Sequence, residues 1–176
     1  MASFAHRFLI IISSLSLITC SARFHATQDL ISTACSHTLY YEICISSLNS
    51  DPRTKTADLQ ELANVALNLT ISYGQETLAH ITDLKSTARG NDTVSSCLGD
   101  CMEVFSDAVE ELNEAIDALR IKSLENVKTF VSAAMTDSDT CDEGFKEIGF
   151  VSPVSDKTLY FSKLCSIFLA IVNLLT

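Results

Sequence analysis

Cysteines and acidic residues are the side chains of this 176-residue sequence with the clearest chemistry: cysteines form disulfides, and acidic residues attract basic partners. One of the seven cysteines, Cys20, falls in an apolar N-terminal stretch, and six lie beyond it. Cys35 and Cys44 are separated by eight residues, and Cys101 and Cys141 lie 40 positions apart. In an oxidising compartment we expect such cysteines to pair, and six of them allow 15 pairings.

A bridge between Cys101 and Cys141 is geometrically natural if the two residues lie at the same end of two antiparallel helices. Cys97 precedes Cys101 by one helical turn and competes for the same partner. Two alternatives stay open for Cys97 and Cys165: both are free thiols, or they form a third disulfide with each other. A metal site is not expected. His37 is the only histidine of the mature chain near a cysteine pair, and that pair, Cys35 and Cys44, is needed for a disulfide.

Acidic residues dominate the charge, with 22 Asp and Glu against 12 Lys and Arg and a formal charge of −10. This balance argues against nucleic acid as a partner, because phosphate binding needs clustered basic residues. No Lys or Arg lies between Gly90 and Leu119, where six acids recur at spacings of three and four. These acids are Asp100, Glu103, Asp107, Glu110, Glu114 and Asp117.

One interpretation of this acidic ridge is a solvated helix face that keeps the protein soluble. However, like charges at helical spacing cost stability, which favours a functional use. We therefore hypothesise that Glu103, Asp107 and Glu110 steer the protein onto a basic surface of a partner.

Catalytic signatures are absent from the sequence. The mature chain has only three histidines, His25, His37 and His80. It contains no G-x-S-x-G, H-E-x-x-H or glycine-rich phosphate loop. We expect neither an enzyme nor a cofactor.

Apolar residues spaced alternately three and four apart predict the elements that position these side chains. They indicate helices over residues 56–88, 94–120, 123–136 and 156–175. Short loops between amphipathic helices favour an all-α, up-down four-helix bundle over residues 56–175. Residues 28–48 are expected to form an N-terminal helical hairpin, stapled by its own two cysteines.

Several residues predict interruptions. Gly74 is expected to bend the helix over 56–88. The sequence Thr140-Cys141-Asp142-Glu143 has the form of a capping box, which predicts a separate helical turn after Thr140. Gly144, Gly149 and Pro153 should then break the chain.

The first 22 residues have the pattern of a secretory signal peptide: a basic start at Arg7, an apolar run and small residues up to Ala22. Cleavage after Ala22 would change the formal charge from −10 to −11, because the leader carries one Arg and no acid. In a secreted chain, the sequons at Asn68 and Asn91 become glycosylation candidates, with Asn91 favoured by its apparent loop. Asn68 requires a solvent-facing position on its helix.

The apolar run over residues 167–175 has two interpretations. One is a lipid-anchor signal, which consists of a polar spacer and an apolar tail. The run is short and helically continuous with Leu164, however. A bundle helix with one broad buried face is therefore the favoured interpretation, and we expect no membrane segment in the mature protein.

Sequence blocks along the chain from about Ala26 carry a family resemblance. The blocks are Cys35-x8-Cys44, Asp51-Pro52-Arg53, Asp100-Cys101, Asp107-Ala108-Val109, Ser132-Ala133-Ala134-Met135-Thr136, Cys141-Asp142-Glu143 and Leu164-Cys165. Together they resemble the plant invertase/pectin methylesterase inhibitor family, with a domain over residues 26–175.

The resemblance implies a four-helix bundle with an N-terminal hairpin and the bridges Cys35–Cys44 and Cys101–Cys141. It implies a secreted, apoplastic protein that blocks a plant cell-wall enzyme by one-to-one binding, with Thr136 near the enzyme contact. Thr136 equally fits an end-of-helix polar residue without such a role.

Pectin methylesterase is the favoured target of this resemblance. Invertase inhibitors of the family tend to carry Pro-Lys-Phe where this chain has Leu124-Glu125-Asn126, whereas Cys165 resembles the esterase inhibitors. Acid invertase, cell-wall or vacuolar, stays open as the alternative, because Gly144-Phe145-Lys146-Glu147 resembles a branch named for invertase inhibition. Cys97 departs from the family pattern. A helical carrier of apolar ligands is a further alternative, which a large apolar cavity would favour.

Overall fold

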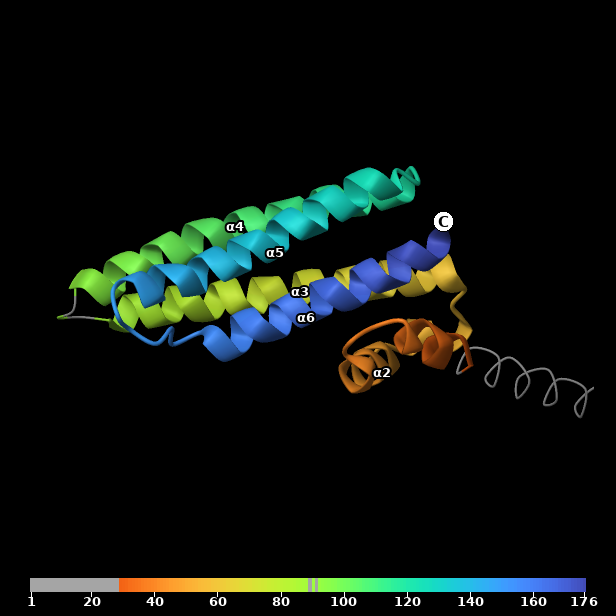
Figure 1. The fold of residues 1–176 in the computed structure, drawn as a ribbon, viewed down its shortest axis with the longest axis horizontal. Coiled ribbons are helices and arrows are strands. Elements are labelled where there is room, and N and C mark those ends of the chain that lie inside the picture. Colours follow the sequence, from red (N-terminus) through yellow and green to blue (C-terminus); the bar gives the residue numbers. More distant parts are fainter. Residues whose placement is uncertain (1–28, 89, 91) are drawn as a thin grey trace, which may run out of the picture.

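The computed structural model describes residues 29–88, 90 and 92–176, and the predicted signal peptide and Asn91 lie outside these residues. Four long helices form an up-down bundle: α3 (Leu59–Thr87), α4 (Asp92–Arg120), α5 (Leu124–Glu147) and α6 (Ser155–Val172). Each packs along its sequence neighbour, and α6 closes the bundle against α3 (Figure 1). The all-α bundle predicted from apolar spacing is confirmed.

The N-terminal hairpin consists of helical residues 29–36 and α2 (Tyr41–Ser50), and it lies beside one end of the bundle (Figure 1). A bridge joins Cys35 to Cys44 across the hairpin, with a Cα–Cα distance of 5.6 Å. The short 3-10 helix η1 (Pro52–Thr56) then leads into α3. The hairpin and its disulfide are therefore confirmed.

Helix α3 begins at Leu59 because Asp58 caps it. The Asp58 carboxylate accepts from the Glu61 backbone N–H at 2.8 Å, while the Glu61 carboxylate accepts from the Asp58 N–H at 3.1 Å. This reciprocal pair satisfies two of the donors that every helix start leaves open. The helix runs without interruption through Gly74, and a bend at this residue stays a prediction. Gly74 allows the Phe161 ring to approach: a Cβ at position 74 would lie 2.9 Å from a Phe161 ring carbon.

Helix α5 is longer than predicted. The sequence indicated an end at 136 and a new turn at Thr140, but one helix continues to Glu147. Thr140 makes no cap, since its hydroxyl donates to the Thr136 carbonyl at 2.8 Å, within the helix. Cys141 and Phe145 continue the buried face of this helix, and that burial favours helix over the local capping signal.

The interior is filled by large apolar side chains, and four phenylalanines are fully buried. These are Phe105, Phe145, Phe161 and Phe168. The segment Ser155–Leu175, which includes the 3-10 helix η2 (Asn173–Leu175), is long and apolar enough to span a membrane. Within the bundle, however, it buries Phe161 and Phe168 against the other helices, so the described structure uses it as a core helix.

Candidate functional site

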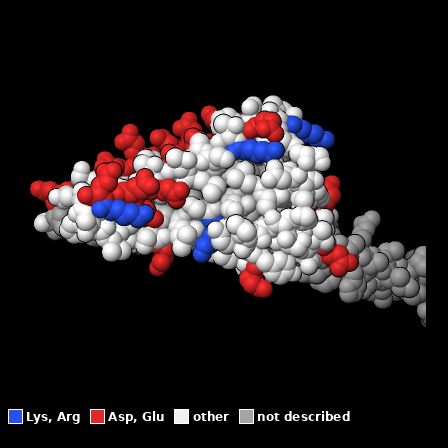
Figure 2. Space-filling view, in the orientation of Figure 1, with Lys and Arg blue, Asp and Glu red and all other residues white. Residues whose placement is uncertain are grey.

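The predicted acidic ridge lies along the outer face of α4. All six of its acids are exposed, and the acidic atoms gather over this helix at the upper edge of Figure 2. The helix places them together because spacings of three and four return to the same side every turn. Among the described residues of α4, the only basic side chain is Arg120, which pairs with Asp117 at 3.0 Å at the end of the helix. The other five ridge acids form no ion pair in the described structure.

Between α4 and α5 the ridge borders a shallow surface hollow of about 340 Å³. It is lined by Asp107, Glu110, Glu111, Glu114 and Asp137. Two of these, Glu111 and Asp137, are half-buried and were not identified from the sequence. Glu111 lies one residue off the exposed stripe, and Asp137 sits in a polar run on α5, so only the packing of the two helices reveals the pair.

Burial raises the pKa of Glu111 to about 7, and the neighbouring Asp137 carboxylate adds to the shift. Burial also raises the pKa of Asp137, although its hydrogen bond to Glu111 acts in the opposite direction. The Glu111 Oε2 atom is buried without a hydrogen-bond partner in the described structure. A proton on Glu111 supplies a donor, which converts two repelling carboxylates into a hydrogen-bonded pair. A proton therefore binds to this site at a higher pH than to an ordinary carboxyl.

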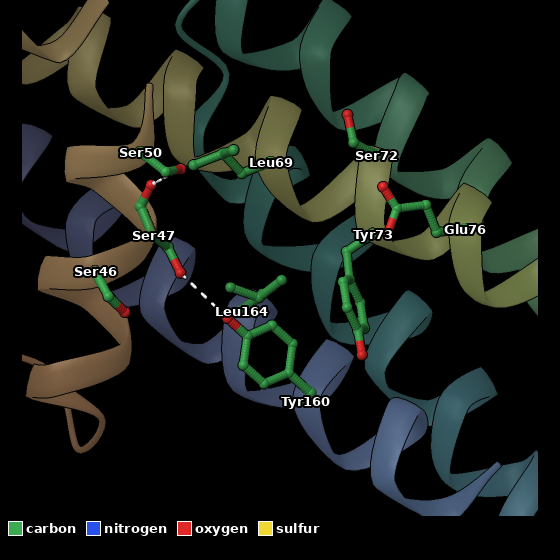
Figure 3. A pocket seen from close by; sticks show the side chains of 9 residues that line it. All are labelled: Ser46, Ser47, Ser50, Leu69, Ser72, Tyr73, Glu76, Tyr160 and Leu164. Atoms are coloured by element: carbon green, nitrogen blue, oxygen red, sulfur yellow. Dashed lines mark hydrogen bonds between the residues drawn. The ribbon is translucent and has the colours of Figure 1, made fainter. Parts of the chain in front are cut away.

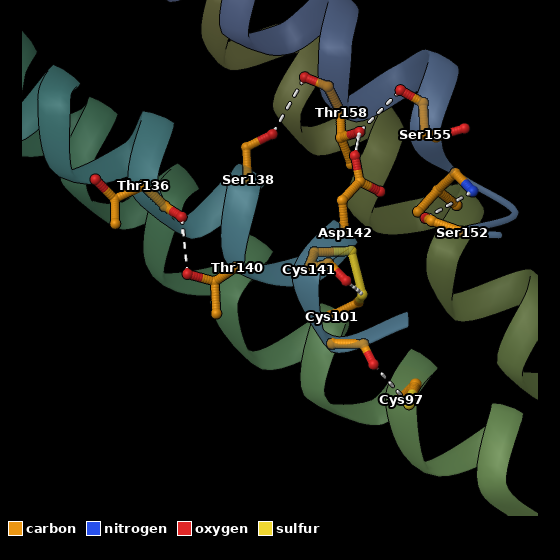
Figure 4. Close-up of a disulfide and its surroundings, with 12 residues drawn as sticks. Cys97, Cys101, Thr136, Ser138, Thr140, Cys141, Asp142, Ser152, Ser155 and Thr158 are labelled. Carbon is orange, nitrogen blue, oxygen red and sulfur yellow. Dashed lines mark hydrogen bonds between the residues drawn. A yellow bond between two sulfur atoms is a disulfide. The ribbon is translucent and has the colours of Figure 1, made fainter. Parts of the chain in front are cut away.

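A disulfide ties the two helices of this face together beneath the ridge (Figure 4). It joins Cys101 of α4 to Cys141 of α5, whose Cα atoms lie 4.6 Å apart. Two further contacts hold α5 to α6: Ser138 Oγ donates to the Thr158 carbonyl at 3.1 Å, and the Thr158 hydroxyl donates to the Asp142 carboxylate. The disulfide and these hydrogen bonds thus hold the helices that carry the acidic ridge in fixed relative positions.

The other two cysteines of the described residues, Cys97 and Cys165, are free thiols. Cys97 is half-buried, with its sulfur 3.8 Å from the Gly144 carbonyl oxygen. Cys165 is fully buried in α6, and burial raises the pKa of its thiol. Of the two options left open by the sequence, the structure has free thiols rather than a third bridge.

Thr136 is exposed on α5, and its hydroxyl donates to the Ser132 carbonyl at 3.1 Å. It directly precedes Asp137, which lines the hollow together with Asp107 and Glu110. Neither Thr136 nor Glu103 lines the hollow itself. Of the four predicted contact residues, the hollow therefore brings together Asp107 and Glu110.

A second hollow, of about 300 Å³, lies where α2 meets α3 and α6 (Figure 3). It is lined by Ser46, Ser47, Ser50, Leu69, Ser72, Tyr73, Glu76, Tyr160 and Leu164. The Ser47 and Tyr160 hydroxyls lie 3.4 Å apart, and the Tyr73 and Tyr160 rings have centroids 4.8 Å apart. The first contact joins the hairpin to the bundle, and the second joins α3 to α6. The hollow is open to the surface, unlike the enclosed apolar cavity that a carrier of apolar ligands needs.

The other residues considered from the sequence lie apart from the α4–α5 face. His37 is exposed in the hairpin turn, His80 is half-buried on α3, and His25 lies outside the described residues. Asn68 is half-buried on α3. Within the described part of the chain, no group of three or more His, Cys, Asp or Glu residues is placed to hold a metal ion.

Known proteins resemble this chain in both sequence and fold. The family model of plant invertase/pectin methylesterase inhibitors matches residues 29–171. A Platanus acerifolia protein named "Putative invertase inhibitor" is 36% identical over 136 residues, which cover 77% of this chain and 75% of that protein. Pectinesterase inhibitor 3 of Arabidopsis thaliana is 26% identical over 161 residues, covering 83% of this chain and 78% of that protein.

A solved structure gives the same fold. The crystal structure of a mutant form of a pectin methylesterase inhibitor from Arabidopsis superposes with a TM-score of 0.70 at 27% sequence identity. The match covers 81% of this chain and 95% of that one. The chain therefore belongs to the plant invertase/pectin methylesterase inhibitor family. It is an inhibitor rather than an enzyme, as the sequence predicted.

Proposed function

We propose that this chain is a secreted inhibitor of pectin methylesterase that covers the enzyme's substrate groove with its α4–α5 face in a one-to-one complex. The observation that carries the proposal is the exposed acidic ridge on α4, a helix that a disulfide joins to α5. Rigid helices lose little freedom on binding, so more of the contact energy becomes affinity. Inhibition requires only steric exclusion of substrate and no chemistry from the inhibitor.

The choice of target draws support from relatives. The solved structures with matching folds are named pectin methylesterase inhibitors. In addition, residues Leu124, Glu125 and Asn126 form the first turn of α5, where the resemblance places Pro-Lys-Phe in invertase inhibitors. Acid invertase remains a second candidate target, because Platanus relatives that are 36% and 32% identical are named for invertase inhibition.

Secretion to the cell wall is part of the proposal. It is supported by the signal-peptide pattern of residues 1–22 and by the names of relatives that inhibit pectinesterases. N-terminal sequencing of the protein from culture medium should begin at Arg23. A start at Met1 would contradict a cleaved leader.

Titration of the purified mature protein against a pectin methylesterase and an acid invertase, side by side, tests the function. We expect stoichiometric loss of esterase activity, with invertase activity retained. Loss of invertase activity alone would make acid invertase, rather than pectin methylesterase, the target. Full activity of both enzymes would overturn the inhibitor assignment, while the fold would stand.

Neutralising the ridge tests the docking face. The triple variant Glu103→Gln, Asp107→Asn, Glu110→Gln should associate more slowly with the enzyme and lose the salt dependence of its association rate. A matched control neutralises three exposed acids elsewhere, at Glu42, Asp83 and Asp156. Equal rates for the two triple variants would leave the ridge as a solubility feature.

Thr136 tests the α5 half of the same face. Its side chain is exposed and bonded only to its own helix, so Thr136→Arg should fold normally. The added bulk should weaken inhibition if the enzyme covers this position. Thr82→Arg, at an exposed threonine of α3 whose hydroxyl likewise donates within its own helix, is the control and should inhibit normally. Unchanged inhibition by the Thr136 variant would remove this residue from the interface.

A further inference from the structure

The sequon Asn68-Leu69-Thr70 lies in the first half of α3. Asn68 is half-buried, and its side-chain amide nitrogen Nδ2 donates to the Asn64 carbonyl at 2.6 Å on the exposed surface. This bond directs the amide toward the N-terminal end of the helix. An N-linked glycan leaves one hydrogen on Nδ2, so the bond to Asn64 is compatible with modification.

A surface groove of about 350 Å³ lies beside that amide, between η1 and the first turns of α3. Its lining consists of Arg53, Thr56, Glu61, Asn64 and Val65. The polar members offer donors and acceptors to sugar hydroxyl and acetamide groups, while the almost fully buried Val65 provides an apolar floor. Because Asn64 both lines the groove and accepts from Asn68 Nδ2, the attachment atom lies one hydrogen bond from the groove.

We propose that Asn68 carries an N-linked glycan whose first N-acetylglucosamine occupies this groove. The inference rests on the secretion included in the proposed function. The Thr70 hydroxyl is buried and donates to the Ala66 carbonyl at 2.9 Å. The glycan must therefore be added before α3 folds, while Thr70 is still accessible.

The glycan would cover the link between the hairpin and the bundle. Arg53 and Lys55 lie in η1 with exposed side chains, and each is followed by a peptide bond that trypsin can cleave. A sugar in the groove beside Arg53 shields this link and opposes its local opening, which cleavage requires. The expected consequence is resistance of the hairpin linker to proteolysis.

The experiment uses the full chain secreted from a eukaryotic host. Glycopeptide mass mapping locates the sugar, and timed trypsin digestion compares cleavage after Arg53 and Lys55 with cleavage after Lys122. Lys122 is exposed in the α4–α5 turn and is an internal control. The variants are Asn68→Gln and, as the matched control, Asn91→Gln. Wild-type protein trimmed by an endoglycosidase to one N-acetylglucosamine tests the first sugar alone.

We expect Asn68→Gln to lose one glycan mass and to be cleaved several-fold faster in η1, with unchanged cleavage after Lys122. Asn91→Gln and the trimmed protein should keep the slow cleavage. If Asn68→Gln folds poorly, enzymatic removal of the glycan from folded wild-type protein gives the same comparison. An unmodified Asn68 in a chain that has lost its leader would overturn the proposal.

Two other outcomes also decide the matter. Equal rates of cleavage in η1 with and without the glycan would contradict the proposal that the first sugar occupies the groove. Fast cleavage of the trimmed protein would show that outer sugars, not the first, shield the linker, which also contradicts the placement. Inhibition measured on the same preparations separates this result from the proposed function, since a glycosylated chain that inhibits neither enzyme would refute only the latter.

Discussion

The two helix pairs of the bundle are held together in different ways. Helices α4 and α5 are joined by the Cys101–Cys141 disulfide and carry the acidic ridge on their outer side. Helices α3 and α6 have no disulfide between them among the described residues. A Cβ at position 74 would press on the Phe161 ring, so these two helices approach each other closely there. Both pairs are therefore held by packing, and α4 and α5 carry a covalent link in addition.

This difference follows from the side chains that each pair carries, which are acidic on α4 and mostly apolar on α6. Like charges along α4 oppose its own helix and its approach to the acids of α5, and a disulfide offsets that repulsion without using the exposed surface. Helix α6 is mostly apolar and can contribute its stability through burial alone. A binding face that must remain charged therefore gains its rigidity from a bond beneath it.

The largest effect is expected from the pair formed by α3 and α6. Phe161→Ala removes a fully buried ring that contacts Phe105, with ring centroids 5.4 Å apart. It should lower the free energy of unfolding by about 3–5 kcal/mol, measured by chemical denaturation. Leu159→Ala, on the exposed side of the same helix, should change it little. Similar losses for both variants would contradict an α6 anchored by its inner face.

Removing the covalent link should cost somewhat less. The double variant Cys101→Ala, Cys141→Ala opens a loop that spans 40 residues and should lose about 2–4 kcal/mol of stability. Hydrogen exchange should rise in α4 and α5 more than in α3 and α6. The control, Cys35→Ala with Cys44→Ala, should loosen only the hairpin. An equal rise in hydrogen exchange across all four helices would show that the disulfide does not stabilise α4 and α5 in particular.

Filling the close contact gives the third prediction. Gly74→Ala gains helix propensity of roughly 1 kcal/mol. However, its Cβ would press on the buried Phe161 ring at 2.9 Å and on Val109 at 3.3 Å. Because overpacking a core costs about 1–3 kcal/mol, we expect net destabilisation, seen as a lower thermal midpoint. Gly144→Ala meets no atom within 4 Å and should instead stabilise the helix. A more stable Gly74→Ala would mean that α3 and α6 can separate easily.

The smallest effect concerns the pH response of the charged pair. The pKa of Glu111 in the folded chain is raised from 4.5 to about 7, so the folded state binds its proton more tightly than the unfolded state. This contribution to stability is present below pH 4.5 and is lost as the pH rises through 7. The loss should be about 1–2 kcal/mol, less than the full shift implies, because solvent screens this partly exposed pair.

Glu111→Gln should remove that part of the pH dependence and raise stability above pH 7, where the native carboxylate repels Asp137. Denaturation curves at several pH values provide the measurement. Glu110→Gln, at the exposed neighbouring position, should retain the native slope. A native slope in Glu111→Gln would place the titration elsewhere.

Much of the fold was predictable because its signals are local. Apolar spacing identified all four bundle helices, and the ridge followed directly from helical periodicity. Helix α5 shows where such reasoning fails: the capping signal at Thr140 is local, whereas the burial of Phe145 that overrides it depends on the other helices. Glu111 and Asp137 were missed for the same reason, since neither has an unusual neighbour in sequence.

The sequence by itself determined the helical class, the hairpin, the exposed acids and the family of this protein, because each depends on residue type and short-range spacing. The tertiary structure decided which cysteines stay unpaired, why Gly74 is accommodated within α3, and that the carboxyls of Glu111 and Asp137 lie together. It also placed the amide of Asn68 beside a groove. These features depend on distances between helices far apart in the chain, and such distances are fixed only when the helices pack.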